Sequence, residues 1–329
     1  MLIMRKVLLA AVASATMMLP IVGQAAEKLV LYTSQPNQDA QTTVDAFKAA
    51  YPDIEVDWVR DGTTKLMAKL GAEIAAGDPR PDVLLIADTV TLEGMKQQGQ
   101  LQAYKSPQAD AYDPALYDAD GYYYSTKLIT TGIVYNTGVS KKPTSWKDLA
   151  DPALKNQIAM PSPLYSGAAL IHLSTLTENP DLGWDYYQAL ADNNARAQGG
   201  NGGTFKAVAS GEKPYGVVVD FLALRGKAAG SPVDFVFPSE GVTYVTEPVA
   251  ILKTAKNVET AHKFVDFVLS GKGQKLVQDM GYIPARNDMD LPAGFPARKD
   301  IKLMAFDPAV ALKNADANKK KFAEMFGAE

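Results

Sequence analysis

Residues Ile158-Ala-Met-Pro-Ser-Pro-Leu-Tyr-Ser-Gly-Ala-Ala-Leu170 join a short apolar strand to an apolar helix. Pro161 and Pro163 disfavour helical backbone before Ser166-Gly167-Ala168, and leucines then recur at helical spacing as far as Leu176. A helix that begins here directs free N–H groups and the positive end of its dipole at whatever lies in front, and a glycine lets an anion approach the backbone. The segment predicts a strand–loop–helix unit with a candidate anion site.

Short apolar strands alternate with amphipathic helices along the rest of the chain, which is typical of an open, mostly parallel α/β sheet. There are two such series, and no long linker separates them. We therefore expect two α/β lobes that the chain connects more than once, near Thr126–Ile133 and Val242–Pro248. The expected strands are 29–32, 54–58, 82–87, 132–135, 158–160, 215–219, 235–237 and 248–252.

The first residues have the order of a secretory signal peptide. Arg5 and Lys6 precede an apolar run, Val7–Val22, and small residues at Gly23–Ala26 suit cleavage after Ala25. The run is interrupted by polar residues and is too short for a membrane anchor. The sequence contains no cysteine, which excludes a lipid-anchored cysteine, disulfides and thiolate chemistry. We expect a periplasmic protein with no nucleic-acid partner, because its net charge of −4 is acidic.

Polar residues at strand ends are the candidate ligand-binding residues, because ligands of open α/β sheets bind at the carboxyl ends of strands. Helix capping or a plain turn is the alternative role for most of them. Asp220 follows the buried strand Tyr215–Val219, where a carboxylate needs a partner. The candidates at this point are Thr33, Ser34, Asp88, Ser162, Ser166, Gly167, Ala168, Asn201 and Asp220.

In this order and spacing, the motifs resemble those of solute-binding proteins of ABC importers. The resemblance is to the group that holds the periplasmic ferric-ion, 2-aminoethylphosphonate and hexose-phosphate binders, and it covers essentially the whole chain after the expected cleavage point. The motifs that carry it are Leu31-Tyr-Thr-Ser34, Pro81-Asp-Val-Leu-Leu85, Thr131-Gly-Ile-Val-Tyr-Asn136, Ser145-Trp-Lys-Asp-Leu-Ala-Asp-Pro152, Ile158-Ala-Met-Pro-Ser-Pro163, Ser166-Gly167-Ala168, Ala207-Val-Ala-Ser-Gly-Glu212 and Lys263-Phe-Val-Asp-Phe-Val268.

The resemblance implies a two-lobe periplasmic-binding-protein fold of type II, with the ligand cleft between two open α/β sheets. Residues 1–25 are the expected signal peptide. Residues 26–130 and 246–290 would form lobe 1, residues 131–245 lobe 2, and residues 291–329 a C-terminal helical segment that packs on both. The implied partners are a small anionic solute and an inner-membrane ABC permease. The protein would be a monomer without catalytic activity, cofactor or metal.

For the ligand, the resemblance favours a phosphonate such as 2-aminoethylphosphonate, or a phosphate ester. Its anionic group would lie on the helix start at Ser166–Ala168, and Asp220, assisted by Glu240, would meet an ammonium or a hydroxyl. A polyamine is an alternative, because Asp88, Asp220 and Glu240 together could hold cations. Outside this class, an exported hydrolase is the alternative, but the sequence lacks the G-x-S-x-G motif.

Ferric binding is disfavoured by a departure from the family pattern. Ferric binders of this group carry two consecutive tyrosines directly after the strand that ends here at Val219, and this chain has Phe221 and Leu222 at the matching positions. A histidine that some of them carry after the first strand matches Pro36. With only His172 and His262 and no cysteine, few metal ligands remain.

We therefore predict that ferric citrate produces no tyrosinate-to-iron charge-transfer colour when it is added to the purified protein. Visible absorption spectroscopy during titration tests this. A band that saturates at one equivalent of iron, and that is lost when Tyr124 or Tyr244 is changed to Phe, would contradict the prediction.

Overall fold

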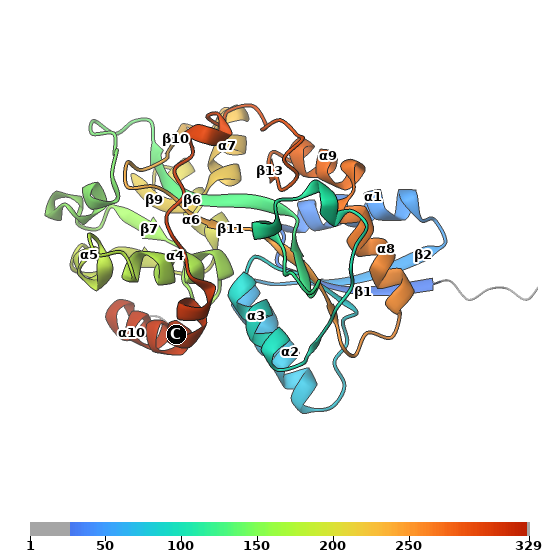
Figure 1. Ribbon diagram of the computed structural model, residues 1–329. Coiled ribbons are helices and arrows are strands. Elements are labelled where there is room, and N and C mark those ends of the chain that lie inside the picture. Colours follow the sequence, from blue (N-terminus) through green and yellow to red (C-terminus); the bar gives the residue numbers. More distant parts are fainter. Residues whose placement is uncertain (1–26, 328–329) are drawn as a thin grey trace, which may run out of the picture.

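The computed structural model describes residues 27–327, so the expected signal peptide lies outside the described residues. The described chain folds into two β-sheets with helices packed on them, side by side in Figure 1. The two-lobe α/β architecture expected from the sequence is confirmed.

The first sheet has the strand order β2-β1-β3-β12-β4, and β5 also pairs with β12. β1 pairs in parallel with β2 and β3, whereas β12 pairs antiparallel with β3, β4 and β5. A strand from late in the chain therefore lies inside this sheet. Its strands are β1 (Glu27–Thr33), β2 (Ile54–Arg60), β3 (Val83–Leu85), β4 (Leu101–Gln102), β5 (Tyr123–Ser125) and β12 (Pro248–Leu252). The helices of this part are α1 (Asn37–Ala50), α2 (Thr63–Ala75), α3 (Thr89–Gln97), η1 (Ala109–Ala111), η2 (Pro114–Leu116), α8 (Val258–Leu269) and α9 (Gly271–Asp279).

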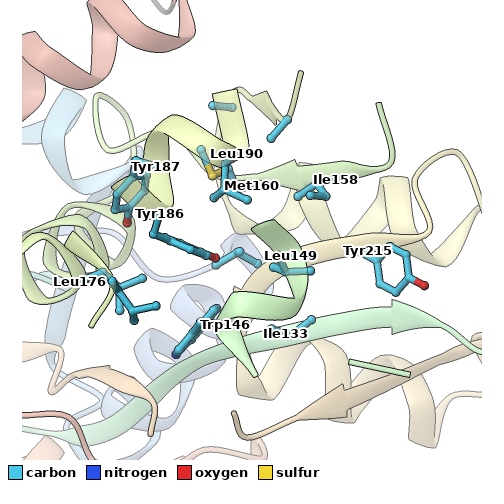
Figure 2. Packing of buried hydrophobic residues seen from close by; sticks show 14 of the residues in the cluster. Ile133, Trp146, Leu149, Ile158, Met160, Leu176, Tyr186, Tyr187, Leu190 and Tyr215 are labelled. Carbon is cyan, nitrogen blue, oxygen red and sulfur yellow. The ribbon is translucent and has the colours of Figure 1, made fainter. Parts of the chain in front are cut away.

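The second sheet is built around the long strand β6 (Lys127–Asn136), in the order β10-β6-β9-β7-β8, with β11 and β13 also paired to β6. Its core surrounds Trp146, which is fully buried and packs among tyrosines and leucines in Figure 2. The other strands are β7 (Ile158–Met160), β8 (Arg196–Ala197), β9 (Tyr215–Val219), β10 (Val233–Val236), β11 (Thr243–Val245) and β13 (Ile283–Pro284). The helices are η3 (Trp146–Ala150), η4 (Pro152–Leu154), α4 (Gly167–Thr177), α5 (Gly183–Asp192), α6 (Asn201–Ala209) and α7 (Asp220–Ala228).

The chain passes from one sheet to the other at Thr126, between β5 and β6, and at Thr246–Glu247, between β11 and β12. Both positions lie within the ranges expected from the sequence. After α9, β13 pairs with Lys127–Leu128 at the start of β6. This third connection lies inside 246–290, which was expected to belong to one lobe throughout.

A buried ion pair joins the first two crossings. Lys127 and Glu247 are only 1% and 2% exposed, and their side chains form a salt bridge. The Thr126 hydroxyl donates to the Glu247 carbonyl at 2.7 Å, and the Gln35 amide donates to the Glu247 carboxylate at 3.3 Å. Glu247 has a φ of +38°, a region that costs free energy for a side chain other than glycine. These contacts hold the two crossing strands together.

The C-terminal part of the chain lies across both lobes. It contains the short helix η5 (Arg298–Asp300) and the helix α10 (Pro308–Phe326). α10 contacts α3 of the first lobe and both α4 and α5 of the second. Figure 1 shows α10 below α4 and beside α3. This segment therefore adds a contact between lobes beyond the crossings.

Lys127→Met should lower the free energy of unfolding by about 3–5 kcal/mol, because it leaves the Glu247 carboxylate buried without its partner. Urea denaturation followed by circular dichroism measures the change. The control is Lys28→Met, because Lys28 pairs with Asp57 on the surface, where the side chains are 50% and 65% exposed. The loss in free energy of unfolding for Lys28→Met should stay below about 1 kcal/mol. Equal losses for the two variants would contradict the prediction.

Candidate ligand-binding site

A pocket of about 310 Å³ lies between the two lobes. Ser34, Arg60 and Thr63 line it from the first lobe, and Tyr165 and Ser166 line it from the second. The other lining residues are Pro36, Gly62, Ala87, Ile129, Ala168, Gly200, Asn201, Gly202, Gly203, Val219, Phe221, Leu222, Glu247 and Tyr282. We refer to it as the main pocket.

Five helices have their N-cap residue in the wall of the main pocket. At α7, whose N-cap is Val219, the Asp220 carboxylate already accepts from the Phe221 N–H, which leaves four other helix starts. The N-cap residues of α1, α2, α4 and α6 are Pro36, Gly62, Ser166 and Gly200, and all four line it. Within residues 27–327, only Ser166 among these caps its helix with a side chain, accepting from the Ala169 N–H at 3.3 Å. The first N–H groups of a helix have no acceptor within the helix, and its dipole is positive at this end. The four starts together favour an anion in the pocket.

Several N–H groups at these helix starts have no acceptor among the described residues. They belong to Thr63 of α2, Ala168 of α4, and Asn201 and Gly202 of α6. The Ser166 N–H, in contrast, donates to the Ser162 carbonyl at 2.9 Å. The expected contact of an anion with that group is therefore not supported, whereas the other N–H groups can donate to a ligand.

Arg60 supplies a full positive charge at the main pocket. Its Nε donates to the Gln35 carbonyl at 2.7 Å, and its Nη1 lies 3.4 Å from the Tyr165 hydroxyl of the other lobe. Arg60 is not among the residues expected from the sequence, because the run Arg60-Asp61-Gly62 resembles a turn. Arg60 is the last residue of β2, so the rule that selects strand-end residues could have found it.

The inner end of the main pocket carries a carboxylate whose charge is compensated. Glu247 lines the pocket but pairs with Lys127, and burial raises the pKa of its carboxyl. Beside it, the Tyr282 hydroxyl donates to Asp39 of α1, which also accepts from the Arg225 guanidinium of α7 at 2.9 and 3.1 Å. The Asp39–Arg225 pair joins the two lobes. Sequence reasoning missed these residues because their partners lie far apart in the chain.

The main pocket brings together four of the residues expected from the sequence: Ser34, Ser166, Ala168 and Asn201. The Asn201 amide donates to the Ser166 hydroxyl at 3.2 Å, so the starts of α4 and α6 are joined directly. The Ser34 hydroxyl accepts from the Ala87 N–H at 2.9 Å rather than capping a helix. Ligand contact by these four residues stays a prediction.

Three other expected residues are adjacent but do not line the main pocket. The Thr33 hydroxyl accepts from the Gln35 N–H at 3.1 Å, and the Ser162 hydroxyl accepts from the Leu164 N–H at 3.2 Å. Gly167 packs against the first lobe: a Cβ atom there would lie 2.5 Å from the Ala87 carbonyl oxygen. This glycine permits close approach of the lobes, whereas close approach of an anion was expected.

Asp220 does not line the main pocket and is 1% exposed. Its carboxylate accepts from the Thr130 N–H and hydroxyl of β6, at 2.8 and 2.7 Å, and from the Phe221 N–H at 2.6 Å. The partner expected for this carboxylate is therefore the neighbouring strand. The structure gives no support to its contact with a ligand tail.

Asp88 and Glu240 also have structural partners and lie outside the main pocket. Asp88 accepts from the Thr91 N–H at 3.1 Å and caps α3, which is the alternative role considered for it. Glu240 accepts from the Ser145 hydroxyl and from the Trp146 N–H, the latter at 3.3 Å, near the start of η3. The expected set of three carboxylates for a cation is not brought together.

The described residues do not gather three or more His, Cys, Asp or Glu side chains that could hold a metal ion. Phe221 and Leu222, at the tyrosine positions of ferric binders, line the main pocket. His172 contacts Thr243 in the second lobe and His262 stacks on Tyr104 in the first, so neither histidine lines the pocket. Among residues 27–327, none of the helices has both the length and the apolarity to span a membrane.

Comparison with known proteins identifies the class. Residues 78–309 match the family model described as bacterial extracellular solute-binding protein. The relatives include an uncharacterized protein of Haemophilus influenzae, 30% identical over 77% of this chain and 76% of that protein. Iron uptake protein A1 of Synechocystis is 26% identical over 84% and 79%. Spermidine/putrescine-binding periplasmic protein 1 of Haemophilus influenzae is 28% identical over 66% and 62%.

The fold is also that of solved solute-binding proteins. The periplasmic binding protein AfuA of Actinobacillus pleuropneumoniae, solved with fructose-6-phosphate bound, superposes with a TM-score of 0.83. The two are 25% identical, over 92% of this chain and 99% of AfuA.

Two α/β lobes around a pocket at their strand ends define a periplasmic-binding-protein fold of type II. The chain belongs to the family of bacterial extracellular solute-binding proteins. Members of this family bind a small solute and deliver it to the permease of an ABC transporter. The resemblance derived from the sequence motifs is confirmed.

Asp220→Asn should change the pH dependence of stability. Burial raises the pKa of Asp220 from 3.8 to about 6, so the folded state favours the protonated carboxyl. The stabilisation that this proton gives is complete below pH 3.8 and is lost as the pH rises through about 6. The free energy of unfolding of the wild type, measured relative to that of Asp220→Asn, should therefore fall by roughly 3 kcal/mol from acid to neutral pH.

Urea denaturation across this pH range measures the difference. Asp53→Asn is the control, because Asp53 is exposed and forms no ion pair or hydrogen bond among the described residues. The free energy of unfolding of Asp53→Asn relative to the wild type should be the same at each pH in this range. A constant difference for Asp220→Asn as well would contradict the structural role assigned to the buried carboxyl.

Proposed function

We propose that this protein is the extracytoplasmic solute-binding component of an ABC importer for a small solute that carries a phosphate-ester or phosphonate group. The observation that carries the proposal is the convergence of four helix starts and Arg60 on the main pocket. Helix starts with free N–H groups and a guanidinium are groups that bind tetrahedral oxyanions.

The charges of the main pocket favour an anion over a polyamine. Its only charged side chains are Arg60 and Glu247 among the described residues, and Glu247 is neutralised by Lys127. A diamine would place positive charge against Arg60 and the helix starts without a free carboxylate to receive it. The spermidine/putrescine-binding relative therefore supports a role in solute transport, but the charges of the pocket do not favour a polyamine as the solute.

The number of donors is sufficient for useful affinity without a metal. Hydrogen bonds that involve a charged group contribute about 1.5–3 kcal/mol each. Three or four of them approach the roughly −8 kcal/mol of a micromolar complex, before the costs of ordering the ligand and closing the lobes. The N–H groups of Thr63, Ala168 and Asn201 together with the Arg60 guanidinium provide this number.

In the proposed complex the anionic group contacts both lobes. Arg60 and Thr63 approach it from the first lobe, and Ala168, Asn201 and the Ser166 hydroxyl approach it from the second. A ligand held in this way stabilises the closed arrangement of the lobes, which a permease can distinguish from the open one. The fructose-6-phosphate complex of AfuA supports a phosphate ester as the first ligand to test.

The proposal includes the location and state of the protein. Residues 1–25 act as a signal peptide, and the mature chain works in the periplasm as a monomer. The periplasmic relatives support this location.

Arg60→Gln should weaken binding of the anionic ligand about ten- to a hundred-fold, because it removes one charge-assisted interaction. Isothermal titration calorimetry of the mature protein with fructose 6-phosphate, 2-aminoethylphosphonate and inorganic phosphate measures the effect. Arg80→Gln is the control, because Arg80 is an exposed arginine outside the main pocket, and its variant should bind like wild type.

Putrescine and ferric citrate complete the titration series. Tight binding of either one by the wild type, with no heat from the three anions, would overturn the proposed ligand class. Unchanged anion affinity in Arg60→Gln would show that the anionic group lies elsewhere.

A further inference from the structure

A second pocket, of about 540 Å³, lies between the lobes and shares no lining residue with the main pocket. The crossing strands separate the two. Leu128 and Thr246 line the second pocket, whereas the next residues in the chain, Ile129 and Glu247, line the main pocket. The second pocket is therefore a separate space, and the proposed function makes no use of it.

The walls of the second pocket are largely aromatic and aliphatic. Tyr117 and Tyr123 line it from the first lobe, Ile171 and Tyr244 from the second, and Phe306 from the C-terminal segment. The hydroxyls of Tyr117 and Tyr244 form no hydrogen bond with the described residues, whereas Tyr123 donates to Glu93 at 2.8 Å. A cavity of this size with aromatic walls and a few polar groups suits a small organic molecule.

Three charged residues line the second pocket, and of the two that form no ion pair with the described residues only Arg298 is partly buried. Lys127 forms the buried ion pair with Glu247. Asp113 is exposed, and its carboxylate accepts from the Ala115 N–H at 2.9 Å. Arg298 is partly buried, and its Nη2 donates to the Pro284 carbonyl at 3.1 Å, but no described carboxylate lies within ion-pair distance of it.

The environment of Arg298 favours an anionic group as its partner. Burial alone lowers the pKa of its guanidinium, since no acidic neighbour acts in the opposite direction. A partly buried cation without a counter-charge costs free energy, and an anion beside it would recover that cost. The guanidinium has further N–H groups that can donate in pairs to a carboxylate.

We propose that the second pocket binds an organic monocarboxylate with an aromatic ring, its carboxylate on Arg298 and its ring among Tyr117, Tyr244 and Phe306. The ring contacts supply apolar burial, and the guanidinium fixes the orientation. Recognition of both parts distinguishes this ligand from inorganic anions and from neutral aromatic compounds.

The test uses three probes that share a phenyl ring and differ in the polar end: 3-phenylpropionate is anionic, 3-phenylpropionamide is neutral and 3-phenylpropylamine is cationic. Isothermal titration calorimetry on the mature protein should show that the carboxylate binds at least about tenfold more tightly than the amide, with the amine weakest. Arg298→Gln should remove this preference. Lys299→Gln, a change at the exposed neighbouring residue, should leave it unchanged.

A second variant locates the binding without altering Arg298. Ala115 is exposed at the rim of the second pocket, so Ala115→Trp should fill the pocket from outside and abolish binding of 3-phenylpropionate while the protein stays folded. Circular dichroism checks folding for each variant.

Several outcomes would overturn the proposal. They are equal affinity for carboxylate and amide, tightest binding of the amine, a carboxylate preference that survives in Arg298→Gln, or undiminished binding in Ala115→Trp. None of these depends on the ligand of the main pocket, so the failure of either proposal leaves the other to be judged separately.

Discussion

The buried ion pair between Lys127 and Glu247 is the constraint on which the arrangement of the two lobes depends. Each residue lies at a point where the chain changes sheet, and neither can reach water. Separating the two crossing strands would take from each of these buried charges its partner, which costs free energy, so the pair favours the arrangement in which the strands stay together. Because the two pockets lie on opposite sides of these strands, the same pair fixes the inner end of one and borders the other.

The chemistry of the main pocket depends on contact between the lobes. α1, α2 and Arg60 belong to one lobe, whereas α4 and α6 belong to the other, so neither lobe alone surrounds an anion. The Thr64 hydroxyl donates to the Pro163 carbonyl at 3.2 Å, and Gly167 lies against Ala87. These contacts place the helix starts close enough for one small group to meet them all. In the proposed complex, selectivity for the anion follows from this arrangement of the two lobes.

The sequence predicts the helices and strands well, but it predicts the contacts between residues that are far apart in the chain less well. Periodicity locates the strands and helices, and the Asp88 cap of α3 follows from local pattern alone. Asp220 shows the limit: its need for a partner is readable, but the partner, Thr130, lies on a strand that only the sheet order brings near. Arg60 and Glu247 escape notice because one resembles a turn residue and the other pairs across the fold. The second pocket has no sequence signal, since the C-terminal segment that lines it is not periodic.

The position of β12 constrains the order in which the molecule can form. This strand pairs with β3, β4 and β5, yet it follows β6 to β11 along the chain. During synthesis the first sheet therefore lacks an internal strand until most of the second lobe has been made, and the edges of β3 and β4 stay unpaired for that time. A chain that completes its first lobe so late keeps open strand edges until β12 is available, and such edges favour pairing with other chains during that time.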